Sequence, residues 1–285
     1  MTFTKLSRRS GAGLLLLLDC LCMSAAPATA HEFWLEPTTF APAAAPDESL
    51  LIAAYVGTGF RGDVLPYAPT HSVRLAARQS RETDLREGAV NGDLYLAAVA
   101  PDAGGCLVSF VSSFTSIQLP AAEFDRYLAL EGLDGPLAAR KAEGGAKPGR
   151  ERYRRCAKTW IRGADSRRVT TPVGIPLEIV PLADPALPGP LTVRVLIGGK
   201  PLAETLVRAW NQPLENGSAP REQASRDSVS AAASVRTDAA GLATLALDRP
   251  GEWLLSAIHM VPCREATEAD WESTWASLTF ARLTK

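Results

Sequence analysis

Short apolar or alternating runs, separated by turn residues, recur through the first half of the chain. Such runs predict β-strands, here at Ser49–Val56, Ser72–Ala77, Gly92–Val99 and Cys106–Ser112. From Ala121 the spacing changes to that of a helix, with Phe124, Tyr127, Leu128 and Leu130 on one face. A second stretch, at 151–161, carries Tyr153, Cys156, Ala157 and Trp160 at helical spacing. The pattern therefore predicts strands followed by helices between about 121 and 161.

The second half of the chain is more uniform. Leu191–Ile197 alternates, and Gly198-Gly199 after it predicts a hairpin turn. The polar residues 214–230 indicate an exposed loop. Two further strands are expected at Trp253–Val261 and Trp275–Leu283, so this half reads as strands throughout.

A polar stretch from Arg162 to Thr171 separates the two halves. We therefore predict a mainly β protein with two β-sandwich-like domains, at 31–170 and 171–285, and a short helical insertion in the first. The run Thr237–Trp253 resembles small immunoglobulin-like and transthyretin-like sandwich modules, which indicates that architecture for the second domain. Such sandwiches host many roles, so the fold alone predicts no function.

The first thirty residues have the order of a secretory signal peptide. Three basic residues precede an apolar stretch at Gly11–Met23, and the small residues Ala28–Ala30 suit a signal peptidase. We expect cleavage after Ala30 and a periplasmic protein that begins at His31. Ser7-Arg8-Arg9 resembles a twin-arginine signal, which leaves both general and twin-arginine export open.

The net charge and the composition limit the classes of partner that the protein can bind. The 285-residue chain has a net charge of −1, which becomes about −3 without the signal peptide. This balance predicts no nucleic-acid partner, and no later apolar run is long enough for a membrane span. We find no phosphate-binding glycine loop, nucleophile elbow or C-x-x-C motif, and we predict that the protein is not an enzyme.

Three cysteines remain after the signal peptide: Cys106, Cys156 and Cys263. An odd count in an oxidising compartment allows at most one intramolecular disulfide. We predict Cys106–Cys156, because both lie in the first predicted domain.

His31 is the first candidate metal ligand. A histidine at a free N-terminus offers its α-amine and its ring Nδ1, which together close a chelate ring on one ion. The α-amino pKa lies near 8, so this amine loses its proton to a metal more readily than a lysine does. Imidazole nitrogen suits nickel, copper and zinc, and the adjacent carboxylate of Glu32 is a further candidate ligand.

The two other histidines are His71 and His259. His259 lies in a strand pattern, and we predict it as a ligand or a partner of a ligand. Its neighbour Met260 must face the other side of the strand, so we assign Met260 to the core. His71 follows Pro69-Thr70, which favours a position on the surface or in a turn. As a ligand it would matter, because two imidazoles and a terminal amine nearly complete a square-planar nitrogen site.

Several segments resemble a family of bacterial periplasmic proteins that are labelled as the periplasmic component of a nickel/cobalt uptake system. The matching segments are His31–Pro37, Leu119–Phe124, Tyr153–Lys158, Pro176–Pro181, Ala257–Met260 and Asp270–Phe280. The resemblance implies a β-rich, two-part protein that handles metal. It supports metal roles for His31 and His259, which lie inside matching segments.

Three functions follow. The first is a periplasmic protein that binds a divalent transition metal ion, nickel or cobalt with copper or zinc as alternatives, and delivers it to a membrane metal transporter. The second is an adhesion, scaffold or receptor-associated module with incidental histidines and residues 214–230 as its contact. The third, a copper-dependent oxidative enzyme built on His31, ranks last because no substrate-binding signature accompanies it. The metal site as predicted requires His31 and His259 to converge on one point.

Overall fold

The computed structural model describes residues 32–42, 49–213, 230–265 and 267–283, and within them strands dominate. The central sheet has the order β14 (Ala233–Arg236), β13 (Leu206–Gln212), β16 (Gly251–Pro262), β17 (Trp271–Arg282), β9 (Gly149–Ile161), β7 (Cys106–Ser112), β4 (Ser72–Arg78) and β5 (Glu82–Asp84), and β8 (Thr115–Leu119) also pairs with β9. The mainly β fold that the sequence predicts is confirmed.

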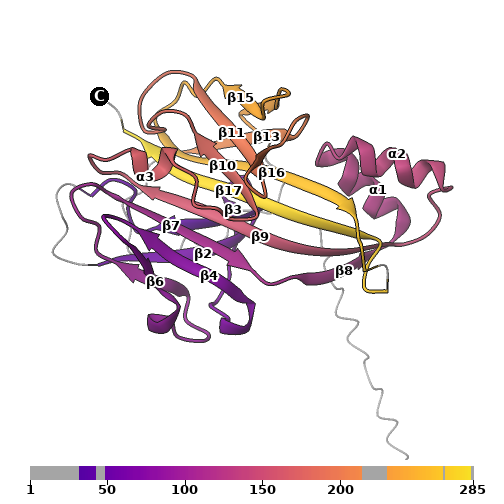
Figure 1. Ribbon diagram of the computed structural model, residues 1–285, viewed down its shortest axis with the longest axis horizontal. Helices are drawn as coiled ribbons and strands as arrows, with labels where there is room; N and C mark the ends of the chain where they lie inside the picture. The colour runs from indigo at the N-terminus through magenta and orange to yellow at the C-terminus, as the bar shows by residue number, and fades with distance from the viewer. Residues whose placement is uncertain (1–31, 43–48, 214–229, 266, 284–285) are drawn as a thin grey trace, which may run out of the picture.

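Two smaller sheets cover this central sheet. The N-terminal sheet contains β1 (Glu32–Pro37), β2 (Leu50–Thr58), β3 (Arg61–Val64) and β6 (Tyr95–Val99). The C-terminal sheet contains β10 (Leu177–Pro181), β11 (Leu191–Ile197), β12 (Lys200–Pro201) and β15 (Leu242–Leu245). Figure 1 shows the C-terminal sheet above the central sheet and the N-terminal sheet below it.

The two sandwich cores lie on opposite faces of the central sheet. Along β9, Ala157 and Ile161 pack against the N-terminal sheet, whereas Trp160 packs against the C-terminal sheet. This division follows from the alternation of side chains along a strand. The central sheet is thus the middle layer of a three-layer arrangement, and β9 contributes to both cores.

A parallel pairing joins the two halves of the chain. β17 lies beside β9 from Trp271↔Glu151 to Thr279↔Thr159, whereas the other strand pairs that the structure describes are antiparallel. The sequence-predicted halves at 31–170 and 171–285 therefore share one sheet.

Most predicted elements are present. The strand predictions at Cys106–Ser112 and Leu191–Ile197 coincide with β7 and β11. Gly198 and Gly199 have φ values of 54° and 78°, which suit the tight hairpin between β11 and β12. The predicted loop at 214–230 lies outside the described residues except for its last residue.

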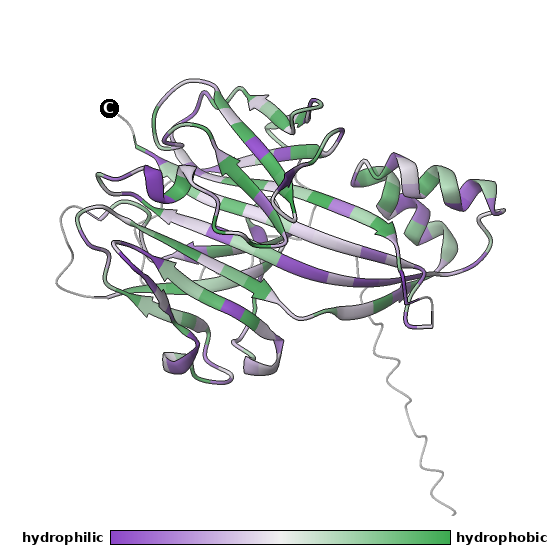
Figure 2. Cartoon of the chain, in the orientation of Figure 1, coloured by the Kyte–Doolittle hydropathy of each residue, from purple (hydrophilic) through white to green (hydrophobic). Residues whose placement is uncertain are grey.

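The helix expected at 151–161 is wrong, because these residues form β9. The second half of β9 is buried on both faces, which removes the two-residue alternation that marks a half-exposed strand. Its first half is rich in arginine and is hydrophilic in Figure 2.

Helices α1 (Ala121–Leu130) and α2 (Asp134–Ala142) confirm the earlier part of the helix prediction, and α3 (Arg167–Thr170) is a single turn. Single 3-10 turns lie at Pro69–His71 and Arg86–Gly88. α1 buries Phe124, Tyr127 and Leu128 against Met260 and neighbouring residues at the far end of β16 and β17. The core role predicted for Met260 is confirmed. No helix within the described segments is long and apolar enough to cross a membrane.

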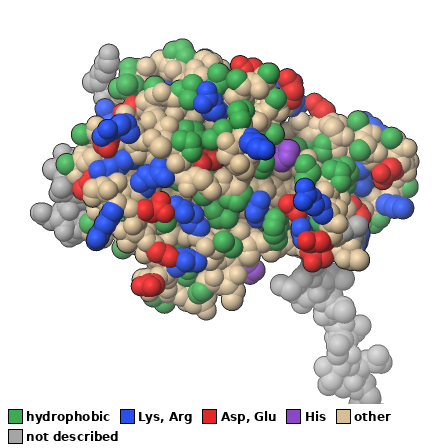
Figure 3. All heavy atoms as spheres, in the orientation of Figure 1, with side chains coloured by type: hydrophobic (Ala, Val, Ile, Leu, Met, Phe, Trp, Pro, Cys, Tyr) green, Lys and Arg blue, Asp and Glu red, His purple; other side chains and the backbone are tan. Residues whose placement is uncertain are grey.

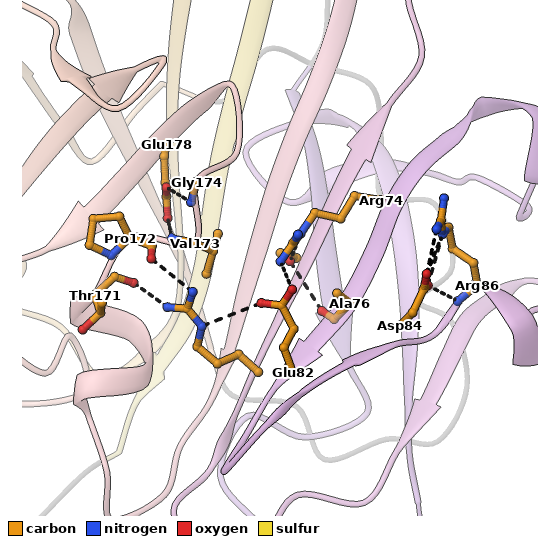
Figure 4. A network of polar contacts seen from close by, with 12 residues as sticks. Arg74, Ala76, Glu82, Asp84, Arg86, Thr171, Pro172, Val173, Gly174 and Glu178 are labelled. Atoms are coloured by element: carbon orange, nitrogen blue, oxygen red, sulfur yellow. Dashed lines mark hydrogen bonds and ion pairs between the residues drawn. The ribbon is translucent and has the colours of Figure 1, made fainter.

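A buried ion pair links the central sheet to the C-terminal sheet. Lys158 Nζ lies 2.8 Å from Glu178 Oε1, and both side chains are at most 2% exposed. The Glu178 carboxylate also accepts hydrogen bonds from the backbone N–H groups of Val173 and Gly174 (Figure 4). Arg78 of β4 donates to the carbonyl oxygens of Thr171 and Pro172, the two residues just before them. Hydrogen bonds from both the central and the C-terminal sheet therefore fix the connection between the predicted halves.

The predicted Cys106–Cys156 disulfide is wrong, because the three described cysteines are free and buried. In the β7–β9 register, Cys156 pairs with Val111 and Cys106 pairs with Ile161. The two cysteines therefore lie five strand positions apart, about 16 Å, far beyond the reach of a disulfide.

We expect all three thiols to be unreactive in the native protein. Burial raises the pKa of the Cys106 thiol to about 12 and that of Cys156 to about 11, and Cys263 is also buried. Because the thiolate is the reactive form, a thiol reagent at pH 8 should modify these residues only after unfolding. Spectrophotometric titration of the protein lacking residues 1–30 should then count three thiols. A count of one after unfolding would instead show a disulfide.

Candidate functional site

The first residue that the structure describes, Glu32, is fixed in place. It begins β1, pairs with Gly57 of β2, and is 2% exposed. The strand is anchored further along, where Thr279 of β17 donates a hydrogen bond of 2.6 Å to the carbonyl oxygen of Leu35. β1 thus presents the Glu32 side chain at a defined position against the central sheet.

The Glu32 carboxylate belongs to a cluster that we call the acid cluster: Glu32, Glu131, Glu151 and Arg208. Arg208 on β13 donates from Nη2 to Glu32 Oε1 at 2.9 Å, and the same nitrogen contacts Glu131 at the end of α1. Three segments far apart in the sequence therefore meet at one guanidinium group.

Glu151 on β9 forms the other side of the acid cluster. It is 2% exposed and accepts hydrogen bonds from the hydroxyl groups of Tyr127, at 3.2 Å, and Ser273. The Tyr127 ring stacks on Trp275 with ring centres 6.1 Å apart. These contacts hold Glu151 in an aromatic environment with little water.

Burial dominates the electrostatics of the acid cluster. It raises the pKa of Glu131 to about 8, against the opposing effect of Arg208, and raises the pKa of Glu151 to about 7. Burial also raises the pKa of Glu32, although Arg208 counteracts it. Arg208 contacts two of the three carboxyl groups, Glu32 and Glu131, and a further cation at this place would favour the ionised forms of all three.

The structure does not bring His259 to this cluster. His259 lies between Ile258 and Met260 of β16, which pack under α1 on one face of the central sheet. His259 therefore points to the opposite face. Arg208, which donates to Glu32, pairs in register with Ser256 of β16. Ser256 lies two residues before Ile258, so Arg208 and Ile258 face the same side of the sheet. Glu32 and His259 therefore lie on opposite faces of the central sheet. The convergence of His31 with His259 stays a prediction, because His31 lies outside the described residues.

His71 is exposed on the 3-10 turn before β4, as a surface residue should be. Its Nδ1 lies 3.3 Å from Ser113 Oγ. It lines a pocket to which Phe33, the residue after Glu32, also contributes. The histidine side chains visible in Figure 3 lie apart, which agrees with their placement on different elements.

His31, the first candidate ligand, lies outside the residues that the structure describes. Among the residues that are described, no three His, Cys, Asp or Glu side chains are arranged to hold a metal ion. A metal site with three such donors next to β1 would therefore need at least one donor from outside the described residues. The excess of carboxyl groups over guanidinium in the acid cluster is chemically compatible with a nearby cation.

Sequence reasoning missed Glu131, Glu151 and Arg208. Their only local signal is that each is a charged residue inside or beside an apolar pattern. Their grouping depends on the packing of α1 and β1 on the central sheet, which one sequence does not show. Asp270 and Glu272 pair with Arg150 and Arg152 at 2.7 and 2.6 Å.

Comparison with known proteins gives a family and little else. The model of a family described as a domain of unknown function, DUF4198, matches residues 28–261. No curated protein matches the chain. A solved structure, the D0-D1 domain of intimin, is 14% identical over 89% of this chain and 98% of that chain, with a TM-score of 0.21. A TM-score this low does not establish a shared fold.

Proposed function

Because this chain belongs to the DUF4198 family, whose description leaves its function open, we propose a function from the site: the exported protein binds a divalent transition metal ion through the N-terminal residue that cleavage after Ala30 creates. In this proposal His31 supplies its α-amine and its imidazole. The ion is nickel or cobalt, with copper or zinc as alternatives, and the protein passes it to a membrane transporter without catalysing a reaction. The proposal places the protein in the periplasm.

The observation that supports the proposal is the fixed position of Glu32. A metal site is more precise on a rigid element than on a loose tail. The new N-terminus would be bonded directly to a buried strand residue that Arg208 holds at 2.9 Å. A two-nitrogen chelate attached there loses less conformational freedom on binding than one at the end of a mobile tail.

Two groups are candidates to complete the coordination. Glu131 contributes an oxygen donor in the acid cluster, and His71 contributes an imidazole beside Phe33. Arg208 contacts both Glu32 and Glu131, so a carboxylate ligand from this pair has to share that guanidinium group with the ion. His259 lies on the face of the central sheet opposite to Glu32, so we leave it out of the proposed site. The proposal therefore rests on His31 and leaves Glu131 and His71 to be distinguished by mutation.

The test compares two forms of the protein by calorimetry with nickel, cobalt, copper and zinc chloride. One form begins at His31, and the other carries one extra alanine before it. The extension converts the His31 amine into an amide nitrogen, whose lone pair is delocalised into the carbonyl group and is a poor metal donor. We therefore expect the affinity for the metal ion to fall by at least about tenfold, or 1.4 kcal/mol. Glu131→Gln and His71→Ala, made in the first form, identify the third donor.

His259→Ala is the matched control, because it removes an imidazole on the opposite face and should leave the affinity unchanged. Equal affinity of the two forms would contradict the terminal chelate. Absence of measurable binding to both forms would favour the scaffold alternative over metal binding.

A further inference from the structure

A second site, separate from the acid cluster, lies at one end of the N-terminal sandwich. A pocket of about 240 Å³ opens between the N-terminal sheet and the ends of β7, β8 and β9. Its wall is largely apolar and aromatic, formed by residues that include Phe33, Leu65, Tyr67, Leu96 and Phe110. None of its lining residues is an aspartate or a glutamate.

One cation faces this apolar wall. The Arg155 guanidinium lies 5.6 Å from the ring centre of Phe33 and 5.1 Å from that of Tyr153. Its side chain forms no hydrogen bond or ion pair with any residue that the structure describes, whereas Arg152 on the same strand has three carboxylate partners. Burial lowers the pKa of Arg155, and the nearby Tyr153 counteracts this only in part.

A half-buried arginine without an anion is only partly hydrated, which is energetically unfavourable, and an incoming carboxylate would offset that cost. The planar guanidinium group matches a carboxylate through two parallel hydrogen bonds. Ser112 Oγ accepts from the Arg155 backbone N–H at 2.9 Å and donates to the Ser113 carbonyl oxygen. Arg155 is the one permanently charged side chain among the residues that line the pocket.

The pocket volume limits the size of the ligand. A cavity of about 150 Å³ in a protein core holds a benzene molecule. By that measure, 240 Å³ has room for about ten non-hydrogen atoms. The ligand is therefore larger than a simple inorganic anion and smaller than a nucleotide or a peptide.

We propose that this pocket binds a small organic monocarboxylate, with its carboxylate on Arg155 and an aromatic or branched apolar body of about ten non-hydrogen atoms against Phe33 and Phe110. This binding needs no metal and does not involve His31. It gives the N-terminal sandwich a ligand-binding role of its own, whatever the outcome at the N-terminus.

The experiment uses the chain from His31 onward in the presence of EDTA, with phenylacetate as the anionic probe and 2-phenylethanol as its neutral counterpart. We expect phenylacetate to bind about tenfold to a hundredfold more tightly, by calorimetry or NMR titration, because only the anion forms a charge-assisted pair with arginine. Acetate should bind much more weakly, since it lacks the apolar body.

Arg155→Met should remove the preference for phenylacetate over 2-phenylethanol, and Arg155→Lys should keep part of it. Arg154→Met is the matched control. Arg154 immediately precedes Arg155 on β9, faces the opposite side of the sheet from the pocket, and donates a hydrogen bond to Thr274. Equal binding of the two probes to the unmodified protein, absence of phenylacetate binding at millimolar concentration, or binding that EDTA abolishes would overturn the proposal.

Discussion

Replacing Glu178 by alanine should lower the free energy of unfolding by about 3–5 kcal/mol. The substitution leaves the Lys158 ammonium group in a fully buried position without its partner at 2.8 Å. It also removes the acceptor of the Val173 and Gly174 backbone N–H groups. Urea denaturation monitored by tryptophan fluorescence measures the effect, which should appear as a lower midpoint with an unchanged slope.

Glu87→Ala is the control for this prediction, because Glu87 is exposed on a 3-10 turn and its loss should change stability by less than about 0.5 kcal/mol. The double variant Lys158→Met with Glu178→Leu removes both charges and should be more stable than Glu178→Ala alone. A Glu178→Ala protein as stable as the Glu87→Ala control would show that the pair does not hold the two layers together.

The stability of the protein should fall as the pH rises from 5 to 8, and Glu151→Gln should remove about 2–3 kcal/mol of that fall. Burial raises the pKa of Glu151 to about 7 in the folded chain, above the ordinary value of 4.5. The folded state therefore binds more protons than the unfolded state between these two values. The stabilising contribution is complete below pH 4.5 and is lost as the pH passes 7. Glutamine keeps an acceptor for Tyr127 and Ser273 but does not ionise.

Denaturation curves recorded at intervals across this pH range, with EDTA present, measure the difference. The Glu131 carboxyl, with a pKa of about 8, should add a fall of the same sign that persists in the Glu151→Gln protein. The control Glu87→Gln replaces an exposed carboxyl and should follow the unmodified protein. Parallel curves for Glu151→Gln and the unmodified protein would show that Glu151 is ionised in the folded state.

The sequence predicts several of the strands because each of these has a local signature. β7 and β11 are short, apolar or alternating, and bounded by turn residues, so their limits were predictable to the residue. The limits of β9 were not predictable, because the pattern of polar and buried residues changes along the strand. Its arginine-rich first half lies beside β8, and its second half is buried between two cores. No single periodicity describes such a strand.

The candidate site was predictable only where it is local. Cleavage after Ala30 points to His31 and Glu32 from the sequence alone, and Glu32 does lie in a polar cluster. The sequence alone does not show which side of its strand His259 faces, whereas the packing of Ile258 and Met260 places it on the side opposite to Glu32. Arg155 gave no signal, because its lack of an anionic partner is a property of the packed structure.

The parallel pair of β9 and β17 also constrains the order in which the protein can form. β17 is the last strand that the structure describes, and it fills the gap between β9 and β16, more than a hundred residues after β9. When β9 has been synthesised and β17 has not, one edge of β9 lacks its partner strand. An unpaired strand edge can pair with other chains and lead to aggregation. Such distant pairing also slows folding. The central sheet, which is one layer of both sandwiches, is thus complete only after the last described strand is added between β9 and β16.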